Sequence, residues 1–155
     1  MYIIKGDLID LAKKNEFDVI IHGCNCFHTF GAGIAKIINK EFPEAFKADL
    51  TTKQGDLNKL GTISFATKGP LTIVNAYTQY KHWKEKGEDP TTPLVNYDAV
   101  RKAFREIKHS FGNKGYKFGI PKIGAGLAGG DWGTIASIID QEMQGENITL
   151  VLLEM

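Results

Sequence analysis

The sequence has little of what marks a secreted, membrane-spanning or nucleic-acid-binding protein. Among 155 residues only two are cysteines, and 19 lysines and arginines nearly balance 18 aspartates and glutamates, for a formal net charge of +1. This balance gives no strong field that would attract nucleic acid or acidic lipids. The longest wholly apolar runs are far shorter than the roughly 20 residues that cross a bilayer. We therefore expect no membrane partner and no nucleic-acid partner.

The two cysteines, Cys24 and Cys26, are separated by one residue. This spacing is too short for a relaxed disulfide, and the second cysteine or histidine pair of a zinc site is missing. We interpret both as reduced structural thiols and expect neither a metal nor a cofactor. The first residues lack the basic, apolar and small-residue regions of a signal peptide, so a cytoplasmic location is the expectation.

Length and composition are those of an ordinary folded domain. Hydrophobic residues make up 43% and charged residues 24% of the chain, which is close to the average for globular proteins. A chain of this length buries one sizeable core. We predict a single domain over residues 1–155 and expect a monomer.

Apolar patterning predicts strands that alternate with helices. Strands are expected over residues 2–5, 17–22, 62–67, 71–77, 116–120 and 148–153, and helices over residues 8–12, 33–42, 44–50, 96–111 and 132–143. Residues 17–22 are continuously apolar and β-branched, which is typical of a central strand. The Lys-Gly-Pro segment at residues 68–70 indicates a hairpin. The fold class is therefore α/β, a three-layer α/β/α sandwich with a mixed six-stranded sheet.

Two glycine-rich loops are the first functional signal. Several of the 17 glycines cluster at residues 31–33 and 124–130, each time between a predicted strand and a predicted helix. Such loops turn backbone N–H groups toward a ligand, and the following helix N-terminus attracts anions. If the two strands are neighbours, the loops face each other at the carboxyl ends of the sheet and suit a diphosphate. The alternative is that the glycines merely tighten two turns.

Neither loop has the spacing of a nucleotide triphosphatase P-loop. Residues 124–129 do spell G-x-G-x-x-G, and Glu146 lies about where a ribose-binding acid would follow. Only one βαβ unit fits around this motif, however, so a nicotinamide-dependent dehydrogenase is not expected.

Three side chains near the loops are candidate catalytic residues. His22 ends the central strand and suits acid or base work if it faces the ligand; otherwise it is a core histidine. Asn25 is able to bind sugar hydroxyls through its carboxamide, or else it forms a turn. Asp131 precedes a helix, where it serves as an N-cap, orients a water molecule, or does both.

Residues 79–93 are polar, contain two prolines and are predicted to form an exposed loop. Aromatic and basic residues alternate here as in a single-strand nucleic-acid platform, but the acidic residues of the loop offset that charge. A lid over the ligand and an inert solvated loop are the remaining interpretations.

The chain resembles the macro domain family. The resemblance rests on Gly-Asp-Leu at residues 6–8, on I-H-G-C-N-C at residues 21–26 followed by G-A-G-I-A at residues 31–35, and on P-K-I-G-A-G-L at residues 121–127 with Trp132. Within the family the chain is similar to the small stand-alone branch with fungal ADP-ribose 1″-phosphate phosphatases and terminal ADP-ribose glycohydrolases.

The resemblance implies an ADP-ribose pocket at the carboxyl ends of the sheet. Asp7 would accept from the adenine amino group with Leu8 beside the ring, and Asn25 would hold the distal ribose. The implied ligand-binding residues are Gly6, Asp7, Leu8, Gly23, Cys24, Asn25, Phe30, Gly31, Ala32, Gly33, Ile34, Ala35, Ile123, Gly124, Ala125, Gly126, Leu127, Ala128 and Gly129.

One departure bears on the activity. Ala128 stands where the glycohydrolase type has an aspartate that acts with a lysine, so lysine-adduct chemistry is not expected. The resemblance favours a hydrolase that removes the phosphate of ADP-ribose 1″-phosphate, with His22 or Asp131 managing protons. The alternatives are hydrolysis of an ADP-ribosyl or O-acetyl-ADP-ribose ester, and non-catalytic binding of ADP-ribose or ADP-ribosylated proteins.

Overall fold

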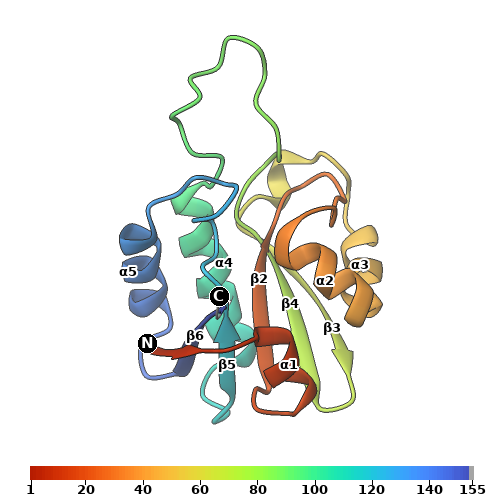
Figure 1. Cartoon of the computed structure of the whole chain (residues 1–155), viewed down its shortest axis with the longest axis vertical. Helices are drawn as coiled ribbons and strands as arrows, with labels where there is room; N and C mark the ends of the chain where they lie inside the picture. Colours follow the sequence, from red (N-terminus) through yellow and green to blue (C-terminus); the bar gives the residue numbers. More distant parts are fainter. Residues whose placement is uncertain (154–155) are drawn as a thin grey trace.

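The computed structural model describes residues 1–153, in which strands and helices alternate (Figure 1). The elements are β1 (Tyr2–Lys5), α1 (Leu8–Lys13), β2 (Val19–Cys24), α2 (Gly33–Glu41), α3 (Pro43–Leu50), the 3₁₀ helix η1 (Leu57–Lys59), β3 (Ile63–Lys68), β4 (Leu71–Tyr77), α4 (Tyr97–Phe111), β5 (Lys117–Ile120), α5 (Trp132–Glu142) and β6 (Asn147–Leu152).

The six strands form one mixed sheet in the order β1-β6-β5-β2-β4-β3. The β3–β4 pair is the predicted hairpin and is antiparallel, whereas the other neighbouring pairs are parallel. As predicted, β2 is interior, because it pairs with β5 on one side and β4 on the other. The carboxyl ends of β2 and β5 therefore lie next to each other.

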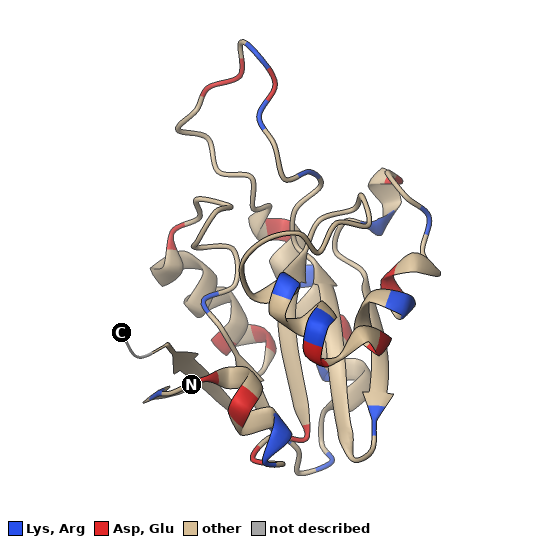
Figure 2. Cartoon of the chain, turned by 45° about the vertical axis from the view of Figure 1, so that its right-hand side comes forward, with Lys and Arg blue, Asp and Glu red and all other residues tan. Residues whose placement is uncertain are grey.

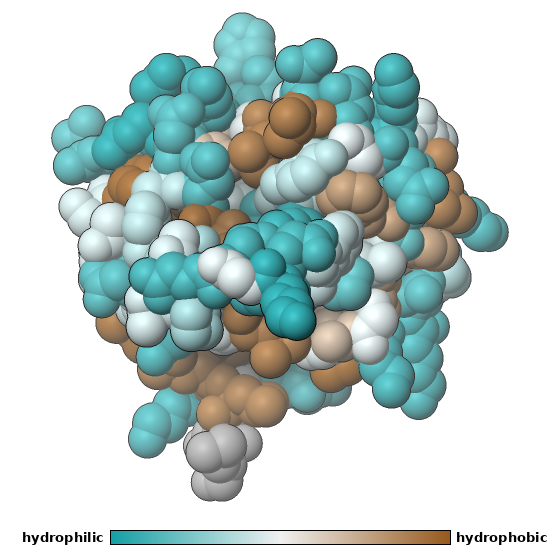
Figure 3. Space-filling model, turned by 90° about the horizontal axis from the view of Figure 1, so that it is seen from above, coloured by the Kyte–Doolittle hydropathy of each residue, from teal (hydrophilic) through white to brown (hydrophobic). Residues whose placement is uncertain are grey.

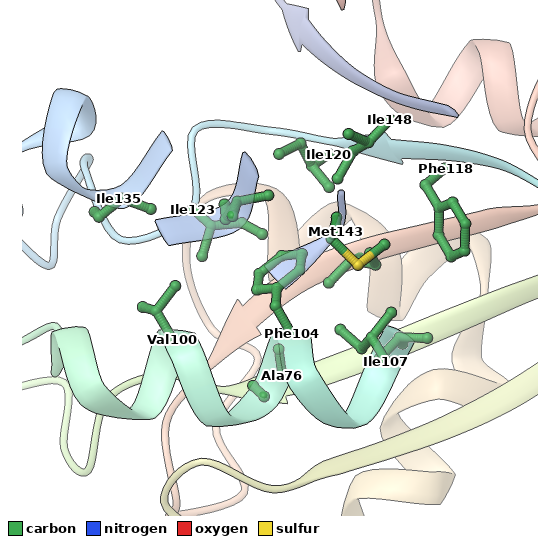
Figure 4. Close-up of a cluster of buried hydrophobic side chains, with 14 of the residues drawn as sticks. Ala76, Val100, Phe104, Ile107, Phe118, Ile120, Ile123, Ile135, Met143 and Ile148 are labelled. Atoms are coloured by element: carbon green, nitrogen blue, oxygen red, sulfur yellow. The ribbon is translucent and has the colours of Figure 1, made fainter. Parts of the chain in front are cut away.

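Helices cover both faces of the sheet, which confirms the predicted three-layer sandwich. On one face α1, α2 and α3 contribute to a core that includes Leu8, Ile38 and Ala45. On the other face α4 and α5 pack over a second core, in which Phe104 of α4 lies among side chains from the sheet (Figure 4). The apolar residues of α4 recur at helical spacing, which is why one side of this helix is buried.

Element boundaries differ from the sequence prediction by a few residues. The largest shift is in β2, which begins at Val19 and continues to Cys24 instead of spanning residues 17–22. Pairing explains the extension, because Cys24 lies opposite Tyr77 in the parallel ladder with β4. Pairing with another strand is not visible in local patterning.

Residues 79–93 project beyond the carboxyl end of the sheet as the predicted loop (Figure 1). Both signs of charge alternate along it and are also scattered over the helices (Figure 2). Seen from this end, hydrophobic surface shows between hydrophilic side chains (Figure 3). Within residues 1–153 no helix combines the length and apolarity that a membrane span requires.

Candidate functional site

A cavity of about 500 Å³ lies at the carboxyl ends of β2 and β5, between the two glycine-rich loops. It is lined by predicted ligand-binding residues from the end of β2, from both loops and from the start of α2, namely Gly23, Cys24, Asn25, Gly31, Ala32, Gly33, Ile34, Ala35, Ile123, Gly124, Gly126, Leu127 and Ala128. The two loops thus face a common space, as expected from neighbouring parallel strands.

The first loop leads into a helix that has no side-chain cap. Ala32 occupies the N-cap position of α2, and the first-turn N–H groups receive no capping hydrogen bond from it. The residues around this helix start, from Gly31 to Ala35, all line the cavity. Uncapped N–H groups and the helix dipole together form an anion-binding element.

The second loop is held in shape by glycine geometry and by a neighbouring segment. Gly124 has a φ of +73°, and a Cβ there would lie 2.6 Å from Val95 Cγ2. The N–H of Leu94 donates to the carbonyl of Ala128 at 2.7 Å. The close approach of residues 94–95 therefore needs a residue without a side chain at position 124.

The charges around the cavity are of one sign. None of its lining residues is an aspartate or glutamate, and Lys122 is the lysine among them. Residues 1–153 contain no cluster of three or more histidine, cysteine or acidic side chains suited to a metal ion. A lining of this kind favours an anionic ligand.

Asn25 lies in the cavity wall with its carboxamide engaged in the loop. Its Oδ1 accepts from the Phe27 N–H at 2.9 Å, and its Nδ2 donates to Thr29 Oγ1 at 2.7 Å. The turn-forming role is therefore present in the structure. Binding of a distal ribose by Asn25 stays a prediction.

His22 does not reach the cavity, which argues against its predicted role in proton transfer. The side chain is fully buried, and its Nε2 lies 2.7 Å from Asn75 Oδ1. Burial lowers the pKa of His22 to about 4, with the Asn75 hydrogen bond opposing the shift. His22 is thus a neutral core histidine, and it packs edge-on against Phe30, which is buried as well.

Asp131 is also separate from the cavity lining. It is the N-cap of α5, where its Oδ2 accepts from the backbone N–H and the hydroxyl of Thr134 at 2.9 and 2.7 Å. These hydrogen bonds lower the pKa of Asp131. The capping role is what the structure shows, and the predicted catalytic role has no support from its position.

Other predicted residues lie outside the lining, namely Gly6, Asp7, Leu8, Phe30, Ala125 and Gly129. Asp7 Oδ1 caps α1 by accepting from the N–H groups of Ile9 and Asp10. Leu8 is buried in the core. The cavity does not extend to Asp7 or Leu8. Their contact with an adenine therefore stays a prediction.

The two cysteines are free and buried, as predicted. Burial raises the pKa of both thiols, so they stay protonated near neutral pH. Glu146 forms an ion pair with Lys108 and accepts from the N–H of Asn113, and it is not among the residues that line the cavity.

The structure adds lining residues that were not among the predicted site residues: Thr29, Gln79, His82, Leu94, Pro121 and Lys122. Gln79, His82 and Leu94 come from the projecting loop and its ends, the segment for which a lid over the ligand was one of the two remaining interpretations. Pro121 and Lys122 directly follow β5 and belong to the P-K-I-G-A-G-L segment that carries the resemblance, which was the available signal.

No family model matches the sequence. An uncharacterised 17.5 kDa protein of Enterobacteria phage T4 is 36% identical over 155 residues, which cover 96% of this chain and 93% of that protein. The ADP-ribose 1″-phosphate phosphatase of Saccharomyces cerevisiae is 25% identical over 165 residues, covering 89% of this chain and 90% of the yeast protein.

Solved structures share the fold over nearly the whole chain. A protein of unknown function from Bacteroides thetaiotaomicron has a TM-score of 0.82 at 26% identity, covering 99% of this chain and 97% of its own. The macrodomain of Thermus aquaticus DarG has a TM-score of 0.72 at 17% identity, covering 99% of this chain and 97% of its own. Thermosipho africanus DarTG, solved in complex with ADP-ribose, has a TM-score of 0.71 at 12% identity, covering 100% of this chain and 42% of its own. The likeness extends over nearly the whole chain, and the chain therefore has the macrodomain fold.

Proposed function

We propose that this chain binds ADP-ribose in the cavity between its two glycine-rich loops and hydrolyses the phosphate of ADP-ribose 1″-phosphate. The observation that carries the binding proposal is the uncapped start of α2, which opens onto a cavity without acidic side chains. A diphosphate supplies the anion that such a helix start stabilises. The phosphatase name of the yeast relative supports the choice of substituent.

In the proposed reaction, a water oxygen attacks the phosphorus, the bond from phosphorus to the 1″ oxygen breaks, and ADP-ribose and inorganic phosphate leave. Backbone N–H groups of the loops stabilise charge on the phosphoryl oxygens. His82 takes the proton of the water and passes it to the departing 1″ oxygen, because it lines the cavity while His22 and Asp131 do not. Imidazole is the side chain best suited to gain and lose a proton near neutral pH.

Non-catalytic binding of ADP-ribose or of ADP-ribosylated protein is the second candidate. It is favoured by the absence of a carboxylate among the lining residues. Hydrolysis of ADP-ribosyl or acetyl esters uses the same cavity and differs in the product.

The test uses Ala32, whose extended backbone (φ −147°, ψ 160°) suits a capping side chain. Ala32→Asp places a carboxylate on the free N–H groups and repels a diphosphate, whereas Ala32→Asn is the matched neutral variant. Calorimetry with ADP-ribose and phosphate release from ADP-ribose 1″-phosphate are measured for the wild type and both variants.

We expect the wild type to bind and to release phosphate, Ala32→Asp to lose both, and Ala32→Asn to be affected less. Binding without release of phosphate would favour the non-catalytic candidate. Absence of binding by the wild type would refute the proposed function.

A further inference from the structure

The imidazole of His82 lines the cavity from a segment that has no regular secondary structure. The His82 side chain is exposed, and an exposed side chain on such a segment changes rotamer freely unless a neighbouring group restrains it. A general base has to stay within hydrogen-bond reach of the proton that it takes. The use of His82 in proton transfer therefore depends on what packs against its ring.

The indole of Trp83 packs against the imidazole of His82. The two ring centroids are 5.1 Å apart at an interplanar angle of 79°, which is the edge-to-face arrangement that aromatic pairs prefer. The Nε1–H of Trp83 donates to Glu85 Oε1 at 2.7 Å and fixes the orientation of the indole. The imidazole is thus packed against a ring that is itself held in place.

The Trp83 ring is anchored on Phe27, at a centroid distance of 4.9 Å and an angle of 67°. The ring of Tyr80 packs against the same phenylalanine at 4.9 Å, and its hydroxyl donates to the carbonyl of Gly55 at 2.7 Å. The chain is therefore fixed on Phe27 both before and after His82.

Phe27 also connects this aromatic group to Asn25 in the cavity wall. The backbone N–H of Phe27 donates to Asn25 Oδ1 at 2.9 Å, while the ring of Phe27 supports Trp83. One residue thus orients the carboxamide through its backbone and the imidazole through Trp83. The loop after β2 and the loop after β4 are held in one arrangement around the cavity.

Core packing does not account for a tryptophan at position 83. Phe27 and Tyr80 pack against the core that lies under α1, α2 and α3, whereas Trp83 is part of neither core within residues 1–153. Its side chain is partly exposed, and substitutions of such side chains change stability less than core substitutions do. The contact with the imidazole is what an aliphatic side chain would not reproduce.

We propose that Trp83 is a positioning residue for His82, and that its indole, anchored on Phe27, holds the imidazole at the cavity for proton transfer. This inference rests on the proposed function and adds a residue that lies outside the cavity lining. Trp83 exchanges no proton and acts only through the orientation of His82. Its loss should therefore slow the chemical step and leave substrate binding nearly unchanged.

The experiment compares the wild type with Trp83→Leu, which removes the ring, and Trp83→Phe, which keeps one. Phe65→Leu is the matched control, because Phe65 is an exposed aromatic residue with an edge-on contact to Phe111 at 5.2 Å, outside the cavity lining. For each protein we measure thermal unfolding, and kcat and KM for phosphate release from ADP-ribose 1″-phosphate. The ring resonances of His82 are recorded without ligand and identified by their absence in His82→Gln.

We expect Trp83→Leu to lower kcat about tenfold to a hundredfold and to change KM by less than about twofold. Trp83→Phe should restore most of kcat, since a ring again packs between Phe27 and His82. The His82 resonances should move toward those of an unpacked imidazole in Trp83→Leu. Phe65→Leu should change neither kcat nor these resonances, and all variants should melt near the wild-type temperature.

The inference fails if Trp83→Leu keeps the kcat of an active wild type, or if it raises KM alone, because Trp83 would then belong to the binding surface. It fails as well if Trp83→Leu and Trp83→Phe lose kcat equally and both melt clearly lower, which is the result of a general structural role. Unchanged His82 resonances in Trp83→Leu refute the inference alone. Wild-type turnover by His82→Gln, or a wild type that releases no phosphate, refutes the proposed reaction and the role of Trp83 in it.

Discussion

The buried His22 predicts a specific loss of stability on mild acidification. Its pKa is lowered from 6.5 to about 4 because the ring is fully buried, despite the hydrogen bond to Asn75. Between these two values the unfolded chain binds a proton that the folded chain does not. The free energy of unfolding is therefore highest above pH 6.5 and falls as the pH decreases toward 4.

The size of the loss follows from the two pKa values of His22. Each pH unit inside the window costs about 1.4 kcal/mol, so lowering the pH from 7 to 5 should remove about 2 kcal/mol. The nearby Cys24 thiol, 3.5 Å from His22 Nε2, does not contribute, because its raised pKa keeps it protonated throughout.

The assay is urea unfolding at pH 7 and pH 5, for the wild type and for His22→Gln. The decrease in the free energy of unfolding from pH 7 to pH 5 should be about 2 kcal/mol smaller in the variant than in the wild type. Comparing the two proteins cancels the contributions of all other titrating groups. If the variant does not fold, the ring resonances of His22 in the wild type give the same information. The reasoning is refuted if the two proteins lose equal stability, or if the His22 ring titrates near pH 6.5.

Three further predictions follow. Asp131→Ala should lower the free energy of unfolding by about 1 kcal/mol, because the cap on Thr134 is lost, and should leave phosphate release unchanged; a selective loss of turnover would restore the catalytic role. Lys59→Met should destabilise the protein by about 3–5 kcal/mol in urea unfolding, because the buried Asp49 loses its counter-ion. In the wild type, Lys59 Nζ lies 3.9 Å from Asp49 Oδ1. A change in the free energy of unfolding below about 1 kcal/mol would contradict this. Lys122→Met should weaken ADP-ribose binding and flatten its dependence on salt in calorimetry, since Lys122 is the lysine of the cavity lining; an unchanged salt dependence would place Lys122 away from the diphosphate.

The fold was predictable because its signals are local. The hairpin turn at residues 68–70, the apolar run that became β2 and the helical spacing in α4 each follow from short stretches of sequence. The meeting of the two glycine loops followed from one assumption, that β2 and β5 are neighbours, which the sheet order confirms.

The roles of individual polar residues were harder to predict because they depend on which way a side chain points. His22 and Gly23 are adjacent, yet successive side chains of a strand face opposite sides, and the histidine turns into the core beside Asn75. His82 enters the cavity lining from a loop without regular structure.

The central claim, that the two glycine loops together bind ADP-ribose, is tested most directly by amide resonances of isotope-labelled protein during titration with ADP-ribose. We predict saturable shifts in both residues 31–35 and residues 123–128, and none in the exposed face of α5. Shifts confined to one loop, shifts mainly elsewhere, or no saturable change would contradict the account.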